Sequence, residues 1–177
     1  MDVAQMQKQF LEFVAYLGRE GILDGQFAQL HSLQDESNPD FVIEVVSLFF
    51  EDSERIINLL AAALQQQVVN FKEADAIAHQ FKGSTSSIGA QRVKNACLCM
   101  KTMCDAENLD GSLQCLQVIK NEYALVKSQL QILVNVSYFY PVLSHCNILE
   151  DNNFPEPSTI GWSCCLSWFL DMVSQLC

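Results

Sequence analysis

Apolar residues recur every three or four positions along most of the chain, which is the spacing of one face of an α-helix. The clearest stripe, near the N-terminus, consists of Val3, Met6, Phe10, Phe13, Val14 and Leu17. Similar stripes, separated by glycines and polar turns, predict further helices over residues 25–33, 39–67, 71–87 and 91–107, and from about 111 to at least 130. Asn38 is expected to cap the third helix, with Pro39 at its first helical position.

The connections between the last four predicted helices are short, so neighbouring helices should run antiparallel. We therefore expect an all-α fold, namely an antiparallel up-down four-helix bundle with additional N-terminal helices, about six helices in all. Half of the residues are hydrophobic, which is enough to fill the core of such a bundle.

Basic residues are confined to the first part of the chain. All ten Lys and Arg lie at or before Lys127, and from Ile132 onward there are four acids and no base. We therefore expect a helical domain over residues 1–131 and an atypical, weakly ordered apolar extension over 132–177. Residues 132–149 carry no charge, but polar residues interrupt them and no Lys or Arg flanks them, so a membrane span is not expected.

The chain is acidic, with 21 Asp and Glu against 10 Lys and Arg and a formal net charge of −11. This balance argues against nucleic acid as a partner, because phosphate backbones attract clustered cations. No basic segment precedes an apolar run at the N-terminus, so we expect no secretory signal and eight reduced cysteines. The cysteines include no C-x-x-C pair, and neither a metal site nor a cofactor is expected.

His79 stands apart from the apolar face of the fourth predicted helix. It points about 155° away from the centre of the stripe formed by Phe71, Ala74, Ile77, Ala78, Phe81, Thr85 and Ile88. The histidine should therefore be exposed, with Asp75, Lys82 and Gly83 as neighbours one helical turn away.

This cluster has the chemistry of a covalent phosphoryl carrier. A neutral imidazole is a nucleophile near pH 7, and Lys82 can neutralise an anionic group placed on it. Gly83 has no Cβ, so another protein can approach the histidine closely. The alternative is an ordinary surface His beside an ordinary Lys, but the ordered string H-x-x-K-G-S on an exposed helix face favours a carrier.

Lys101 is a second candidate cation. It lies about as far after the turn at Gly89 as His79 lies before it, so in an antiparallel hairpin both sit about 15 Å from the turn. Lys101 could lean toward His79 from the flank of its helix, although a solvated boundary lysine is an equally good interpretation.

The sequence resembles the plant histidine-containing phosphotransfer proteins, the carriers of the cytokinin-type multistep phosphorelay. The resemblance covers about residues 1–131 and rests on the segments AHQFKGS at 78–84, SIGAQRV at 87–93, SNPDF at 37–41, VVSLFFEDS at 45–53 and NEY at 121–123. It implies that His79 accepts a phosphoryl group from a receiver-domain aspartate of a sensor hybrid histidine kinase and passes it to a response-regulator aspartate. It also implies a cytoplasmic and nuclear protein with no kinase activity of its own, whose partner receivers hold the divalent metal.

Docking of a receiver should bury an apolar patch near His79, for which the candidates are Leu23, Phe27, Phe41 and Val45. Two features depart from the family: Lys101 stands where members often carry Arg, and residues 132–177 do not look like the family's polar tail. The alternative function is therefore a helical adaptor or decoy that binds receivers without transferring phosphate, for instance because the tail impairs the fold.

Overall fold

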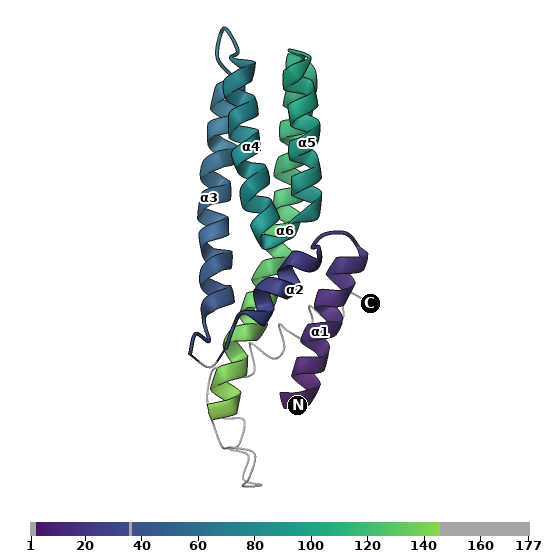
Figure 1. Cartoon of the computed structure of the whole chain (residues 1–177), viewed down its shortest axis with the longest axis vertical. Coiled ribbons are helices and arrows are strands. Elements are labelled where there is room, and N and C mark those ends of the chain that lie inside the picture. Colours follow the sequence, from purple (N-terminus) through teal and green to yellow (C-terminus); the bar gives the residue numbers. More distant parts are fainter. Residues whose placement is uncertain (1–2, 36, 146–177) are drawn as a thin grey trace, which may run out of the picture. The chain divides into compact units, whose positions relative to one another are not determined.

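A computed structural model describes residues 3–35 and 37–145, and this part of the chain contains helices but no named strand. The six helices are α1 (Val3–Arg19), α2 (Gly25–Ser32), α3 (Phe41–Leu64), α4 (Phe71–Ile88), α5 (Gln91–Asp105) and α6 (Leu109–His145). Helices α3 to α6 run side by side, and α1 and α2 lie against one end of this bundle (Figure 1). The predicted all-α bundle is confirmed.

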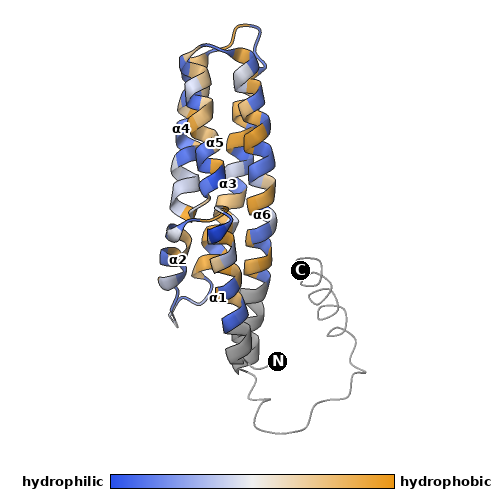
Figure 2. Ribbon diagram, turned by 90° about the vertical axis from the view of Figure 1, so that its right-hand side faces the viewer, coloured by the Kyte–Doolittle hydropathy of each residue, from blue (hydrophilic) through white to orange (hydrophobic). Residues whose placement is uncertain are grey.

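Each helix of the bundle is amphipathic, and Figure 2 shows apolar and polar positions alternating along it. The largest side chains that are almost wholly buried come from all six helices, and they include Leu17, Phe27, Leu60, Phe81, Met100 and Ile119. One continuous apolar core therefore holds the N-terminal helices and the bundle together.

The start of α3 differs from the prediction. Asp35, not Asn38, supplies the local side-chain acceptor: its Oδ1 accepts hydrogen bonds from the backbone N–H groups of Ser37 (2.9 Å) and Asn38 (3.0 Å). These bonds fold the segment into a turn, and the helix begins two residues after Pro39, at Phe41. The far ends of α3 and α5 are also two or three residues shorter than predicted, at Leu64 and Asp105.

The turn between α4 and α5 is tied to the start of α2. Gly89 ends α4 in the left-handed conformation, with φ +80°, and its carbonyl accepts a hydrogen bond of 2.8 Å from the N–H of Asp24. Asp24 in turn caps α2, because its side chain accepts from the N–H of Gln26. A Cβ at Gly89 would lie 2.6 Å from Asp24 Oδ1 and 2.9 Å from the backbone nitrogen of Phe27. Only glycine fits this corner.

Helix α6 passes through the predicted domain boundary at residues 131–132 and continues to His145. Leu133 and Val134 are buried, 2% and 7% exposed, because the packing face of the helix continues beyond the point where the composition changes. The helix therefore extends beyond the predicted boundary, whereas the weak order of the extension stays a prediction, and residues 146–177 lie outside the described residues. None of the helices in the described ranges is long and apolar enough to span a membrane.

Cross-helix polar contacts fix α6 against its neighbours. The Tyr123 hydroxyl donates to the backbone carbonyl of Phe50 on α3 (3.2 Å). Arg92 on α5 donates from Nη2 to Glu122 Oε1 (3.0 Å), and its Nε lies 2.7 Å from Oε2 in the same ion pair. These contacts join α6 to α3 and to α5.

Substitution of Gly83 and of Gly89 by alanine should change the stability of the fold in opposite directions. Gly89→Ala is expected to lower the free energy of unfolding by about 2–3 kcal/mol, because it combines a left-handed backbone with a backbone clash. The control is Gly83→Ala, whose Cβ meets nothing within 4 Å, and which should raise stability by up to about 1 kcal/mol. Urea denaturation measures both, and equal stability of the two variants would contradict the assignment of the Gly89 corner.

Truncations should locate the end of the bundle. Deleting residues 132–177 removes the buried Leu133 and Val134 and should cost about 2–4 kcal/mol of stability. Deleting only residues 146–177 keeps both side chains and should leave the melting temperature of the bundle unchanged. Equal melting temperatures for the two truncated chains would show that the core ends at residue 131 after all.

Candidate functional site

The inner face of α4 is buried as its sequence predicts, with Ala74, Ala78, Phe81, Thr85 and Ile88 inside the core. Phe71 and Ile77 are half-buried and pack against the same core. His79 follows Ala78 directly and lies on the opposite, exposed side of the helix. The burial of one face of α4 therefore turns the imidazole outward, where a second protein can reach it.

His79 lines a small hollow between α4 and α5. Asp75, Ala78 and Lys82 line it from the same helix, and the residues from α5 are Cys97, Leu98 and Lys101. The structure thus brings together the three side chains singled out by the sequence, His79, Lys82 and Lys101. The sequence did not indicate Cys97 or Leu98, although they sit four and three positions before Lys101, on the adjacent turn of one helix face.

Lys82 is half-buried, and among the described residues no carboxylate lies within salt-bridge distance of it. Burial raises the pKa of the Cys97 thiol to about 12. The positive charge of nearby Lys82 opposes this rise only in part. Cys97 is therefore a protonated, inert thiol beside His79. Lys82 is free to bind an anionic group.

Lys101 reaches from α5 toward α4 but is engaged by two carboxylates. Its Nζ lies 3.3 Å from Asp105 Oδ1 and 3.4 Å from Asp75 Oδ2. Hydrogen bonds to these two carboxylates, that to Asp105 foremost, raise the pKa of Lys101. Its expected position on the flank beside His79 agrees with this geometry. A role of Lys101 in holding a phosphoryl group stays a prediction, because its ammonium group would have to release a carboxylate before it could bind the phosphoryl oxygens.

Gly83 has open space around it, since a Cβ built there meets no atom within 4 Å. The helix around it is well bonded, and the carbonyl of Lys82 accepts hydrogen bonds from the hydroxyls of Thr85 (2.9 Å) and Ser86 (2.7 Å). Among the described residues, no packing contact explains the glycine. Its predicted role in giving a partner access to His79 stays a prediction.

Two of the four predicted docking residues are wrong. Leu23 and Phe27 are only 2% and 1% exposed, because α2 is tied at its start to the Gly89 corner and turns these side chains into the core. Phe41 and Val45, at the start of α3, are half-buried at the edge of the core. For these two residues docking stays a prediction.

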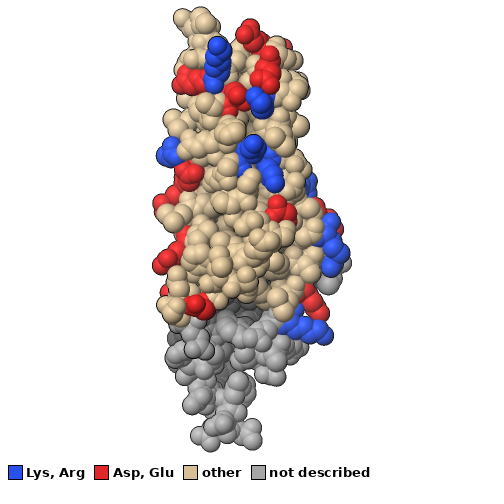
Figure 3. Space-filling model, viewed as in Figure 1, with Lys and Arg blue, Asp and Glu red and all other residues tan. Residues whose placement is uncertain are grey.

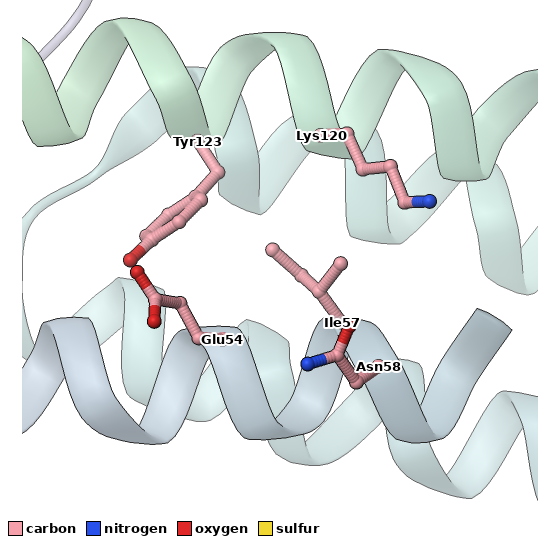
Figure 4. Close-up of a pocket in the computed structure, with 5 residues that line it drawn as sticks. All are labelled: Glu54, Ile57, Asn58, Lys120 and Tyr123. Carbon is pink, nitrogen blue, oxygen red and sulfur yellow. The ribbon is translucent and has the colours of Figure 1, made fainter. Parts of the chain in front are cut away.

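A second pocket lies between α3 and α6, away from the helix face that carries His79. Glu54, Ile57, Asn58, Lys120 and Tyr123 line it (Figure 4). Burial, with Glu54 alongside, raises the pKa of the Tyr123 phenol, so this group stays protonated as the donor to Phe50. Glu54 is paired with Lys127 from the next turn of α6. The contacts of Tyr123 with Phe50 and of Lys127 with Glu54 join the two helices.

The described residues include no cluster of three or more His, Cys, Asp or Glu side chains that could hold a metal ion.

Comparison with known proteins places this geometry in context. Residues 44–129 match the family model described as the Hpt domain. Histidine-containing phosphotransfer protein 1 of Arabidopsis thaliana is 56% identical over 133 residues, which are 75% of this chain and 86% of the relative. Histidine-containing phosphotransfer protein 5 of Arabidopsis thaliana is 49% identical over 135 residues, which are 76% of this chain and 86% of the relative. A crystal structure of a histidine-containing phosphotransfer protein from Medicago truncatula superposes with a TM-score of 0.73 at 44% identity, covering 78% of this chain and 94% of the other.

Proposed function

The chain belongs to the plant histidine-containing phosphotransfer proteins, and on that premise we propose that it carries a phosphoryl group on His79. The donor is a receiver-domain aspartate of a sensor hybrid histidine kinase, and the acceptor is a response-regulator aspartate. The pathway is of the cytokinin type. The protein is a carrier without kinase activity, and it works in the cytoplasm and the nucleus.

One observation supports this proposal above the others: an exposed imidazole lies beside an unpaired lysine, one turn from a glycine with nothing around it. A phosphoryl carrier must meet two different proteins at one atom, so access matters as much as nucleophilicity. Lys82 supplies charge for the phosphoryl oxygens, and Gly83 leaves room for the receiver.

The transfer step needs little from the carrier. The imidazole nitrogen forms a bond to phosphorus while the bond between phosphorus and the aspartyl oxygen breaks, and that electron pair stays on the receiver's carboxylate. Lys82 faces the incoming negative charge and stabilises it. The divalent metal that such a transfer uses belongs to the receiver, and this chain needs no cofactor.

The receiver docks on a largely uncharged surface. In Figure 3 the acidic and basic side chains form small separate groups, and much of the face between them carries no charge. Phe41 and Val45 are the remaining candidates from the start of α3, and Leu98, 46% exposed at the edge of the hollow, adds an apolar side chain beside His79. A net charge of −11 speaks against nucleic acid as a further partner.

Replacing the histidine tests the carrier residue. The chain incubated with a phosphorylated receiver domain should acquire label that is acid-labile and stable to base, as phosphohistidine is. His79→Gln should abolish this labelling with an unchanged helical circular dichroism spectrum, because residue 79 lies outside the core. Persistent labelling of the variant would refute the site. Receiver binding by the unsubstituted chain without any labelling would instead favour the adaptor function.

Adding a side chain at position 83 tests the need for access. Gly83→Gln should keep or slightly raise stability, because Gln is the better helix former and the site has room for it inside this chain. Transfer should nevertheless slow by about tenfold or more, which is about 1.4 kcal/mol of barrier, because the side chain occupies the receiver's path. Stopped-flow or rapid-quench kinetics measure the effect. A wild-type rate in this variant would remove the steric argument.

A further inference from the structure

We propose that Asp75 is a positioning residue for His79, whose imidazole donates its Nδ1–H to Asp75 Oδ1 and so keeps Nε2 free to accept the phosphoryl group. The inference rests on the proposed function, because it concerns the same histidine. It assigns to Asp75 a role separate from its ion pair with Lys101.

The helix places the two side chains together. Asp75 precedes His79 by four residues, and both line the same hollow. Helical side chains lean toward the N-terminus, so the imidazole of His79 tilts back over the turn that carries Asp75. In that orientation the nitrogen nearer the backbone, Nδ1, can be turned to the carboxylate while Nε2 points outward.

The two oxygens of Asp75 are used unequally. Oδ2 accepts from Lys101 Nζ at 3.4 Å, whereas Oδ1 is buried and has no hydrogen-bond partner. A buried carboxylate oxygen without a donor is costly, so a nearby donor should serve it.

The groups around the hollow leave His79 as that donor. On α5, Lys101 already binds Asp75 Oδ2 and Asp105, and the thiol of Cys97 is a weak donor. On α4, Lys82 lies seven residues from Asp75, about 10 Å along the helix axis and on the far side of the histidine. The two side chains are not hydrogen-bonded in the described structure, so the proposed contact requires a rotation of the His79 side chain about its own bonds.

This hydrogen bond has two effects on transfer. It selects the neutral tautomer with the proton on Nδ1, which is the form whose Nε2 lone pair can attack phosphorus. When the N–P bond forms and the aspartyl P–O bond breaks, the proton stays on Nδ1 and the ring gains positive charge. The Asp75 carboxylate then faces that charge across the same hydrogen bond.

The experiment measures the tautomer directly. In the nitrogen-15-labelled full-length chain, at a pH where the imidazole is neutral, the ring shifts of His79 should report mainly Nδ1–H. In Asp75→Ala the ratio should move toward Nε2–H, and the rate of phosphoryl acceptance from a phosphorylated receiver should fall about fivefold, the usual effect of one lost hydrogen bond.

Two control variants separate this role from the ion pair. Lys101→Gln removes the cation and Asp105→Ala removes its other carboxylate, and both should leave the tautomer ratio of His79 as in the unsubstituted chain. An unchanged ratio in Asp75→Ala overturns the inference. So does a shift of equal size in Lys101→Gln, since the effect would then belong to the ion pair.

The tautomer measurement also separates this inference from the proposed function. Absence of label on His79 in the unsubstituted chain would refute the carrier function, while the ring shifts would still decide whether Asp75 accepts from His79. Normal labelling with an unshifted ratio in Asp75→Ala would refute the positioning role and leave the carrier function intact.

Discussion

Burial of one face of α4 is the constraint on which the rest of the site depends. Ala78 and His79 are adjacent in sequence, and the first is 1% exposed while the second lies at the surface. Because the core fixes the rotation of the helix, it also fixes the direction of the imidazole and of the residues one turn away. The protein needs no separate scaffold for its site, since the helix that completes the core also presents His79, the proposed nucleophile.

The charges around His79 follow from this placement and from the acidity of the chain. Within the described residues, half of the ten Lys and Arg form ion pairs with carboxylates, and Lys101 binds two of them. Lys82 is among the cations without such a pair, because the residues one turn away from it on α4, Ala78, His79, Thr85 and Ser86, carry no carboxylate. A cation without a carboxylate partner can bind an incoming phosphoryl group without first breaking an existing pair.

Periodicity alone predicted the helices and the exposure of His79, because both depend on which face of a helix is apolar. Periodicity could not show which apolar residues are buried and which lie at the edge of the core. Phe27 and Phe41 look alike in sequence, but the hydrogen bond from Asp24 to Gly89 orients α2 so that only Phe27 is turned into the core. Composition is a similarly poor guide to where a helix stops packing. Composition changes at residue 132, yet the packing face of α6 continues through Leu133 and Val134. The link from Asp75 to Lys101 joins two helices, and no local pattern reveals it.

Gly83 and Gly89 have opposite reasons to be glycine. At Gly89, the side chain of Asp24 and the backbone of Phe27 occupy the space that a Cβ would need, so contacts within this chain require the glycine. At Gly83 the space is empty, and a helix interior would be more stable with alanine there. Under the proposed function, the open space at Gly83, one turn beyond His79, leaves room for the receiver domain beside Lys82 and the outward side of the imidazole.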